Sequence, residues 1–134
     1  MMRLQSDLSA LCVAALDGKL DQCTAQWDPR PALGVVLAAG GYPDSYRKGD
    51  IISGLDGTDQ ADLKVFHAGT QTEQDSEGKE SVVTAGGRVL CVTALGDSVP
   101  AAQQRAYEGV KQISWADCLY RTDSGYRAVA REQN

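Results

Sequence analysis

The chain has 134 residues, of which 43% are hydrophobic and 23% charged, and its formal net charge is -5 at pH 7. This composition is typical of one globular domain, so it excludes a disordered chain and two full domains. The acidic balance argues against a protein that binds the phosphate backbone of nucleic acids, since that function needs a clustered basic surface.

A membrane location is not expected either. The longest apolar stretch, residues 32–39, is too short to span a bilayer, and residues 1–4 lack the apolar centre and cleavage site of a signal peptide. We therefore expect a cytoplasmic protein with no membrane partner and no nucleic-acid partner.

The first predicted element is a helix over residues 6–17. Ser6 is a good N-cap, Gly18 offers a stop, and the apolar residues between them recur at helical spacing: Leu8, Leu11, Cys12, Ala15 and Leu16. An apolar stripe needs cover, so we expect the helix to pack on the chain's own sheet or to be buried in a homodimer. Residues 21–31 carry two prolines and are predicted to form a linker.

Strands are predicted from residue 32 onwards. The apolar run 32–39 is typical of a strand covered on both faces, and shorter strands are expected at residues 50–52, 64–68, 80–84 and 88–95. The last two flank residues 85–87, Ala-Gly-Gly, which is a pattern typical of a tight hairpin turn.

A second helix is predicted after Ser98, a suitable N-cap. One face of this helix is apolar and comprises Val99, Ala102, Ala106, Val110 and Ile113. Strands followed by a helix and a short strand indicate the α+β class, with a small, mostly antiparallel, barrel-like sheet and one packed helix.

The cysteines and the acidic segment favour ordinary structural roles. The four cysteines form no CxxC pair, and Cys12 and Cys91 lie in apolar runs, where we expect them to fill the core. His67 has no Cys or Asp partner nearby in sequence, so a structural role is favoured over catalysis. Residues 56–80 hold seven acids against two lysines, and we expect a solvated loop without metal-ligand spacing.

Known catalytic motifs are not present in the sequence. We find no GxxxxGK[ST], GxGxxG, GxSxG or HExxH. Three glycine-bearing turns, at residues 40–43, 86–88 and 125–127, each include an aromatic residue or an arginine. A backbone cradle for an anion uses such residues, although a Gly-Gly turn is also explained by positive φ alone.

The order of short motifs along the chain is more specific than any one of them. The motifs, in succession, are Arg-Leu-Gln-Ser-Asp-Leu (3–8), Ala-Ala-Gly-Gly-Tyr-Pro (38–43), Tyr-Arg-Lys-Gly-Asp (46–50), Lys-Val-Phe-His-Ala-Gly-Thr (64–70), Gly-Gly-Arg-Val-Leu (86–90) and Tyr-Arg-Thr-Asp (120–123). This succession resembles the C-terminal part of the phosphoribosylamine-glycine ligase family, of the ATP-grasp superfamily. Asp44 and Ser124 depart from the family pattern, which usually has glycine and an aliphatic residue there.

The resemblance implies a domain organisation and an activity for the whole enzyme. Residues 1–20 look like the last helix of the ATP-grasp domain, and residues 32–134 look like the small C-terminal domain. The family activates glycine with ATP to an acyl phosphate, which the amine of 5-phosphoribosylamine attacks, in de novo purine synthesis. Its ATP and magnesium ligands precede the stretch that matches Met1, so we expect the isolated chain to be inactive, with no catalytic residue, metal or cofactor of its own.

The resemblance also implies substrate contacts and partners. The residues expected to line the substrate cleft are Gly40, Gly41, Tyr42, Arg88 and Arg121, and the ribose phosphate would be steadied by the amides of the two glycines, the Tyr42 ring and either Arg88 or Arg121. The expected partners are the N-terminal and ATP-grasp domains of the same chain, glycine and 5-phosphoribosylamine. The isolated chain could also form a homodimer.

Two other classes of function stay open at this point. A carrier module for biotin or lipoate needs a lysine at a hairpin tip, but residues 85–88 place Arg88 there. A structural interaction module would use the apolar stripe of the first helix to bind a partner.

Overall fold

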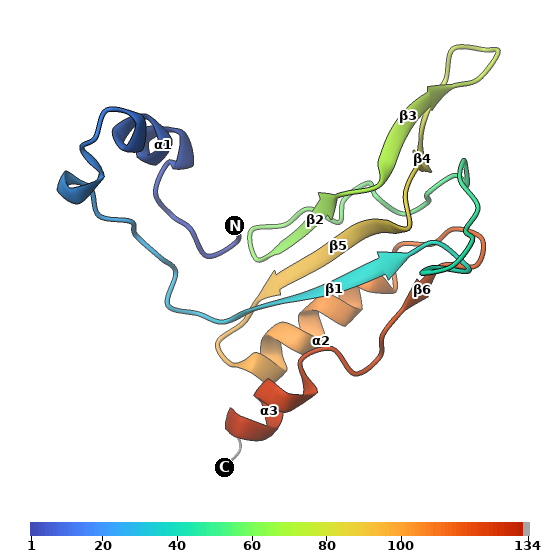
Figure 1. Ribbon diagram of the computed structural model, residues 1–134. Helices are drawn as coiled ribbons and strands as arrows, with labels where there is room; N and C mark the ends of the chain where they lie inside the picture. Colours follow the sequence, from blue (N-terminus) through green and yellow to red (C-terminus); the bar gives the residue numbers. More distant parts are fainter. Residues whose placement is uncertain (133–134) are drawn as a thin grey trace.

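The computed structural model describes residues 1–132, and residues 133 and 134 of the predicted C-terminal domain lie outside the described part (Figure 1). The elements, in chain order, are α1 (Leu8–Leu16), a short 3-10 helix η1 (Leu20–Gln22), β1 (Ala32–Ala38), β2 (Leu63–His67), β3 (Thr70–Gln74), β4 (Glu80–Thr84), β5 (Arg88–Leu95), α2 (Val99–Val110), β6 (Leu119–Tyr120) and α3 (Tyr126–Glu132). No helix within residues 1–132 is long and apolar enough to cross a bilayer.

The main sheet has four strands in the order β2-β5-β1-β6, and every neighbouring pair is antiparallel. Continuous apolar sequence in β1 and β5 suits the two central positions, which have a strand on each side. The predicted α+β class with a mostly antiparallel sheet is confirmed. The barrel-like closure is wrong, because β2 and β6 end the sheet as separate edges and do not pair with each other.

One face of this sheet is covered by α2. Alternation along β1 points Leu33, Val35 and Leu37 toward the helix, which buries its small residues Ala102 and Ala106 completely. These small residues let the helix backbone approach the strands closely, so the core forms between α2 and the sheet. The predicted helix and its cap are confirmed, since the Ser98 hydroxyl accepts a hydrogen bond from Ala101 N at 3.2 Å.

The last helix, α3, has no counterpart in the sequence predictions. Its Glu132 Oε2 accepts a hydrogen bond from Val99 N at 2.8 Å, so a carboxylate from α3 satisfies a free amide at the start of α2. Helix α3 therefore caps the N-terminus of α2 by a contact between residues far apart in sequence.

The predicted hairpin around residues 85–87 is wrong. Strand β4 pairs with β3 in a separate two-stranded sheet, whereas β5 pairs with β1 and β2. The amides of Ala85 and Gly86 both donate to the Gly69 carbonyl, at 2.7 and 3.0 Å, so this segment crosses residue 69 instead of reversing the chain. Residues 50–52 form only an isolated bridge, between Ile51 and Val83, and not the expected strand.

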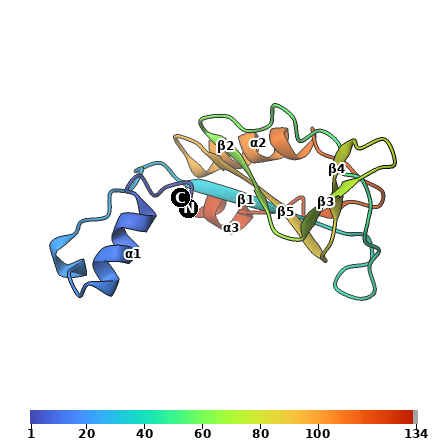
Figure 2. The ribbon, with the colours of Figure 1, turned by 90° about the horizontal axis from the view of Figure 1, so that it is seen from above.

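Helix α1, which belongs to the N-terminal unit of residues 1–27, stands apart from the sheet, as the view from above shows most clearly (Figure 2). No residue of α1 is buried, and Leu16 is 88% exposed, so the expected packing of this helix on its own sheet is wrong. Cys12 is exposed as well, which corrects its predicted role in the core. Asp7 caps the helix in place of Ser6, because the Ser6 hydroxyl accepts from Gln26 N instead.

An ion-pair cluster joins this N-terminal unit to the sheet. Asp28 N donates to the Arg3 carbonyl at 2.7 Å, and the Asp28 carboxylate accepts from Arg30 Nη2 at 2.8 Å. The same Arg30 Nη2 lies 3.0 Å from Asp62 Oδ1, just before β2. Arg30 thus links the connector after α1 to the edge of the main sheet.

Candidate functional site

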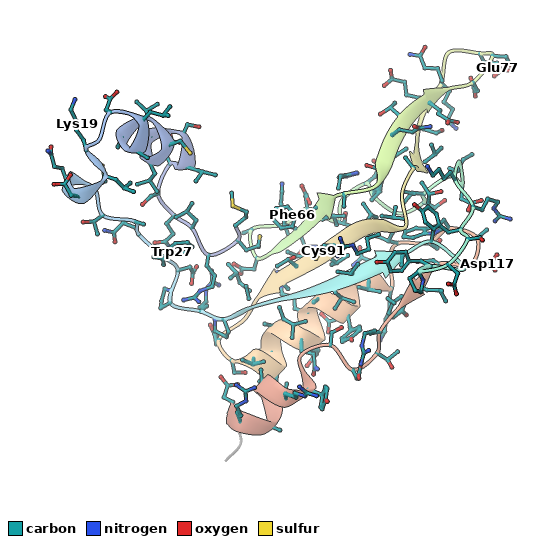
Figure 3. The ribbon with its side chains drawn as sticks, viewed as in Figure 1. Lys19, Trp27, Phe66, Glu77, Cys91 and Asp117 are labelled. Carbon is teal, nitrogen blue, oxygen red and sulfur yellow. The ribbon has the colours of Figure 1, made fainter. Side chains whose placement is uncertain are left out.

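No helix within residues 1–132 packs on the face of the main sheet opposite α2, although Met1, Met2 and Trp27 line a hollow at one end of that face together with Phe66 and Cys91. The register places Val36 beside Cys91, and Cys91 beside Phe66, so these three side chains share that face. Figure 3 shows Phe66 and Cys91 on the side of the sheet away from α2. Val36 is 44% exposed, which is unusual for an apolar residue at the centre of a sheet.

At one end of this open face the structure brings together three of the predicted site residues. Tyr42, Arg88 and Arg121 line one groove of about 370 Å³, and its other lining residues are Val36, Ala38, Leu119 and Tyr120. A second hollow of about 540 Å³ adjoins it and shares Val36, Tyr42 and Arg88. The predicted residues therefore converge from the β1 turn, the start of β5 and the end of β6.

The other two predicted residues, Gly40 and Gly41, do not line these hollows. A Cβ atom on Gly40 would collide with Asp117, and Gly41 has a φ of +91°, with its missing Cβ facing the Ser45 carbonyl. Both glycines thus allow the tight turn that places Tyr42 beside the groove. The Tyr42 amide donates to the Ala39 carbonyl at 3.1 Å, which fixes the residue at the end of the strand.

The two arginines of the groove, Arg88 and Arg121, differ in their hydrogen-bond partners. Arg121 makes two hydrogen bonds to the Asp123 carboxylate, of 2.8 and 2.6 Å, which raise the pKa of Arg121 and lower the pKa of Asp123. Within residues 1–132 the Arg88 guanidinium has no hydrogen bond or ion pair to another side chain. Among the described residues, Arg88 is therefore the arginine of the groove whose guanidinium has no carboxylate partner.

Sequence reasoning missed the apolar wall of the groove. Val36, Leu119 and Tyr120 line it, yet a continuous apolar run predicts burial on both faces and does not tell which alternate positions stay open. An arginine without a carboxylate, beside an aromatic ring and an apolar wall, suits a small anion attached to a less polar body.

The histidine, cysteine and acidic side chains of the described residues form no metal site or catalytic cluster. Within the described residues no group of three or more His, Cys, Asp or Glu side chains is placed to hold a metal ion. His67 is exposed at the end of β2, and its Nδ1 lies 3.0 Å from Thr70 Oγ1. Burial raises the pKa of the Cys118 thiol to about 11, so the reactive thiolate is scarce at neutral pH.

The acidic segment lies partly in the β3–β4 hairpin. Asp75 accepts hydrogen bonds from the amides of Glu77 and Lys79, both at 2.9 Å, which order the tip of this hairpin. Glu77 lies at that tip, far from the main sheet (Figure 3). Residues 71–80 are exposed as expected, but the predicted single loop over residues 56–80 is wrong, because β2 and β3 lie within it.

The chain is similar to known proteins along its whole length. Residues 32–127 match the family model of the phosphoribosylglycinamide synthetase C domain. The phosphoribosylamine–glycine ligase of Allochromatium vinosum is 59% identical over 134 residues, which are 100% of this chain and 30% of that protein. The ligase of Vibrio parahaemolyticus is 61% identical over 133 residues, which are 99% of this chain and 30% of that protein.

A solved structure supports the same relationship. The crystal structure of phosphoribosylamine–glycine ligase from Thermotoga maritima superposes with a TM-score of 0.64 and 34% sequence identity, over 82% of this chain and 26% of that chain. The chain spans about 30% of the length of the curated relatives it matches. The resemblance predicted from the ordered motifs is confirmed: the chain belongs to the family of phosphoribosylglycinamide synthetase C domains.

Proposed function

We propose that this chain is the C-terminal segment of a phosphoribosylamine–glycine ligase and forms one wall of its substrate cleft. The observation that carries the proposal is the identity of about 60% with ligases of that name along the whole chain. The ligase joins glycine to 5-phosphoribosylamine in de novo purine synthesis, and the segment alone supplies no catalytic group.

The reaction assigns different work to the different domains. ATP converts glycine to an acyl phosphate, the amine of 5-phosphoribosylamine attacks the acyl carbon, and phosphate leaves, with ADP as the other product. Phosphoryl transfer needs a magnesium ion held by carboxylates. The described residues offer no such cluster, so ATP and magnesium are assigned to the preceding domains of the same enzyme.

The groove beside β1 is the part of this segment proposed to meet substrate. Arg88 would pair with the phosphate of 5-phosphoribosylamine, because its guanidinium has no competing carboxylate among residues 1–132 and can make two parallel hydrogen bonds to a phosphate. The ring of Tyr42 would lie against the ribose, and Arg121 would complete the rim of the groove. Gly40 and Gly41, which lie outside the groove, would contribute by holding the turn that places Tyr42.

The rest of the open face and α1 are proposed to dock on the preceding domains of the same chain. Val36 on the sheet and Leu16 on α1 expose apolar surface that a monomeric domain normally covers, and Phe66 beside Val36 on the sheet face is half-buried. A cytoplasmic location belongs to this proposal, and the four free thiols are what a reducing compartment maintains.

The carrier alternative loses its structural basis. Residues 85–87 join strands of two different sheets, so no hairpin tip exists there, and Arg88 cannot form the required amide at neutral pH. An interaction module without a catalytic partner is the other alternative, and the exposed face of α1 fits it equally well. The ligase segment and the interaction module are distinguished by whether substitution of Arg88 changes the KM for 5-phosphoribosylamine.

The test is Arg88→Met in the full-length ligase that contains this segment. Loss of a charge-assisted phosphate contact should raise the KM for 5-phosphoribosylamine by about tenfold or more and leave the KM values for glycine and ATP within about twofold. Arg127→Met is the matched control, because Arg127 stacks on Tyr126 and lies outside the groove. An unchanged KM in Arg88→Met, or release of phosphate by the isolated chain with all substrates, would overturn the proposal.

A further inference from the structure

We infer that Tyr107, on α2, is a positioning residue for the groove, because its hydroxyl holds the turn that presents Arg121. This inference rests on the proposed function, in which Arg121 completes the rim of the substrate groove. Tyr107 itself touches neither hollow of the open face.

The hydroxyl of Tyr107 joins the two ends of the turn over residues 121–124. It donates to the Arg121 carbonyl at 2.6 Å and accepts from the Ser124 amide at 3.0 Å. A phenol has one donor and can accept as well, so both functions of this oxygen are used on one turn. The Arg121–Asp123 ion pair forms inside the segment that the hydroxyl closes.

A second side chain from the same face of α2 supports the turn. Gln103 precedes Tyr107 by four residues, one helical turn, and its Nε2 donates to the Ser124 carbonyl at 2.7 Å. The ring of Tyr107 also contacts the ring of Tyr120, with centroids 6.4 Å apart. Since Ala102 and Ala106 bury α2 firmly against the sheet, these contacts tie the turn to the rigid core.

Arg121 depends on this support because little else holds it. Its side chain is 77% exposed, and its carboxylate partner, Asp123, belongs to the same turn and moves with it. Phenylalanine at position 107 would keep the ring but leave the Arg121 carbonyl and the Ser124 amide to water. The turn would then sample other conformations, and Arg121 would spend less time at the rim of the groove.

The experiment is Tyr107→Phe in the full-length ligase, read in two independent ways. Amide hydrogen exchange of the peptide that contains Ser124 should become faster, because the amide loses its acceptor. The KM for 5-phosphoribosylamine should rise by about three- to tenfold, with kcat within about twofold. Tyr126→Phe is the matched control, since it also removes one exposed tyrosine hydrogen bond but lies outside the groove, and both readouts should stay at the wild-type values.

A double variant separates positioning from general destabilisation. Because Tyr107 acts through Arg121, adding Tyr107→Phe to Arg121→Met should not raise the KM beyond the value for Arg121→Met alone. Suppose that Arg121→Met raises the KM. The inference is then overturned if Tyr107→Phe raises the KM equally in the wild type and in Arg121→Met. It is also overturned if Tyr107→Phe leaves the amide exchange at Ser124 or the KM unchanged. If Arg121→Met itself leaves the KM unchanged, Arg121 has no part in the proposed groove, and the inference is overturned together with that assignment.

Discussion

The ring of Tyr42 lies directly against the backbone of Gly87. A Cβ atom added to Gly87 would lie 2.8 Å from Tyr42 Cε2 and 3.1 Å from Tyr46 Cε1, so only glycine leaves room for the ring. The turn after β1 and the approach to β5 are thus fitted to each other at the point where the groove begins.

Gly87→Ala should therefore push Tyr42 out of its position. We expect a loss of about 1–3 kcal/mol in the free energy of unfolding, because the added methyl group has no space. Urea unfolding of the 134-residue chain measures this loss. In a Tyr42→Leu background the cost of Gly87→Ala should become smaller, because the ring that clashes is gone; an undiminished cost would contradict the contact.

Truncation of two neighbouring residues of β1 should lower the stability by very different amounts. Leu37 is fully buried against α2, so Leu37→Ala should lower the free energy of unfolding by about 2–5 kcal/mol. Val36, the preceding residue, points to the open face, and Val36→Ala should cost less than about 1 kcal/mol. Thermal or urea unfolding of both variants is the measurement, and similar costs for the two would show that the open face is covered in solution.

Acid should weaken the joint between the N-terminal unit and the sheet. Hydrogen bonds from Arg30 hold the pKa of Asp28 at about 2, whereas an unfolded aspartate has a pKa of about 3.9. Because the folded-state pKa is lowered, this stabilisation is present above about pH 4 and is lost as the pH falls from there toward 2. Urea midpoints across this range should therefore decrease more steeply for the wild type than for Asp28→Asn.

The control for this prediction is Asp44→Asn. Asp44 is an exposed aspartate that shares no hollow with Arg30, so its substitution should leave the pH dependence of the urea midpoint unchanged. Equal slopes for the wild type and Asp28→Asn would contradict a stabilising role for the Asp28–Arg30 pair at neutral pH.

The exposed apolar side chains of α1 should make the isolated 134-residue chain self-associate. Val13 and Leu16 are 58% and 88% exposed, and a water-exposed apolar helix is stabilised by burial against a second copy. Size-exclusion chromatography with light scattering should give a dimer mass that returns to the monomer mass in Val13→Glu/Leu16→Glu. Gln22→Glu adds a charge just beyond α1 and should remain dimeric, whereas a monomeric wild type would exclude the homodimer.

Local sequence determined the elements whose formation depends on neighbouring residues. The spacing of Ala102, Ala106 and Val110 and the Ser98 cap are short-range features, and helix α2 forms where they predict it. The runs that became β1 and β5 were also identified, because apolar runs of that length are typical of central strands. The ordered motifs identified the family, and three of the five predicted site residues meet in one groove.

Pairing and exposure were decided only by the tertiary structure. The sequence predicts a hairpin at residues 85–87 from adjacency alone, but the amides there bond to Gly69, and β4 pairs with β3. Ser6 is as good a cap as Asp7 until the Gln26 amide occupies its hydroxyl. Likewise, only folding brings the Tyr107 hydroxyl to Arg121 and, among the described residues, leaves Arg88 without a carboxylate partner. Hydrogen bonds and ion pairs depend on distances between residues, which the order of the chain does not specify.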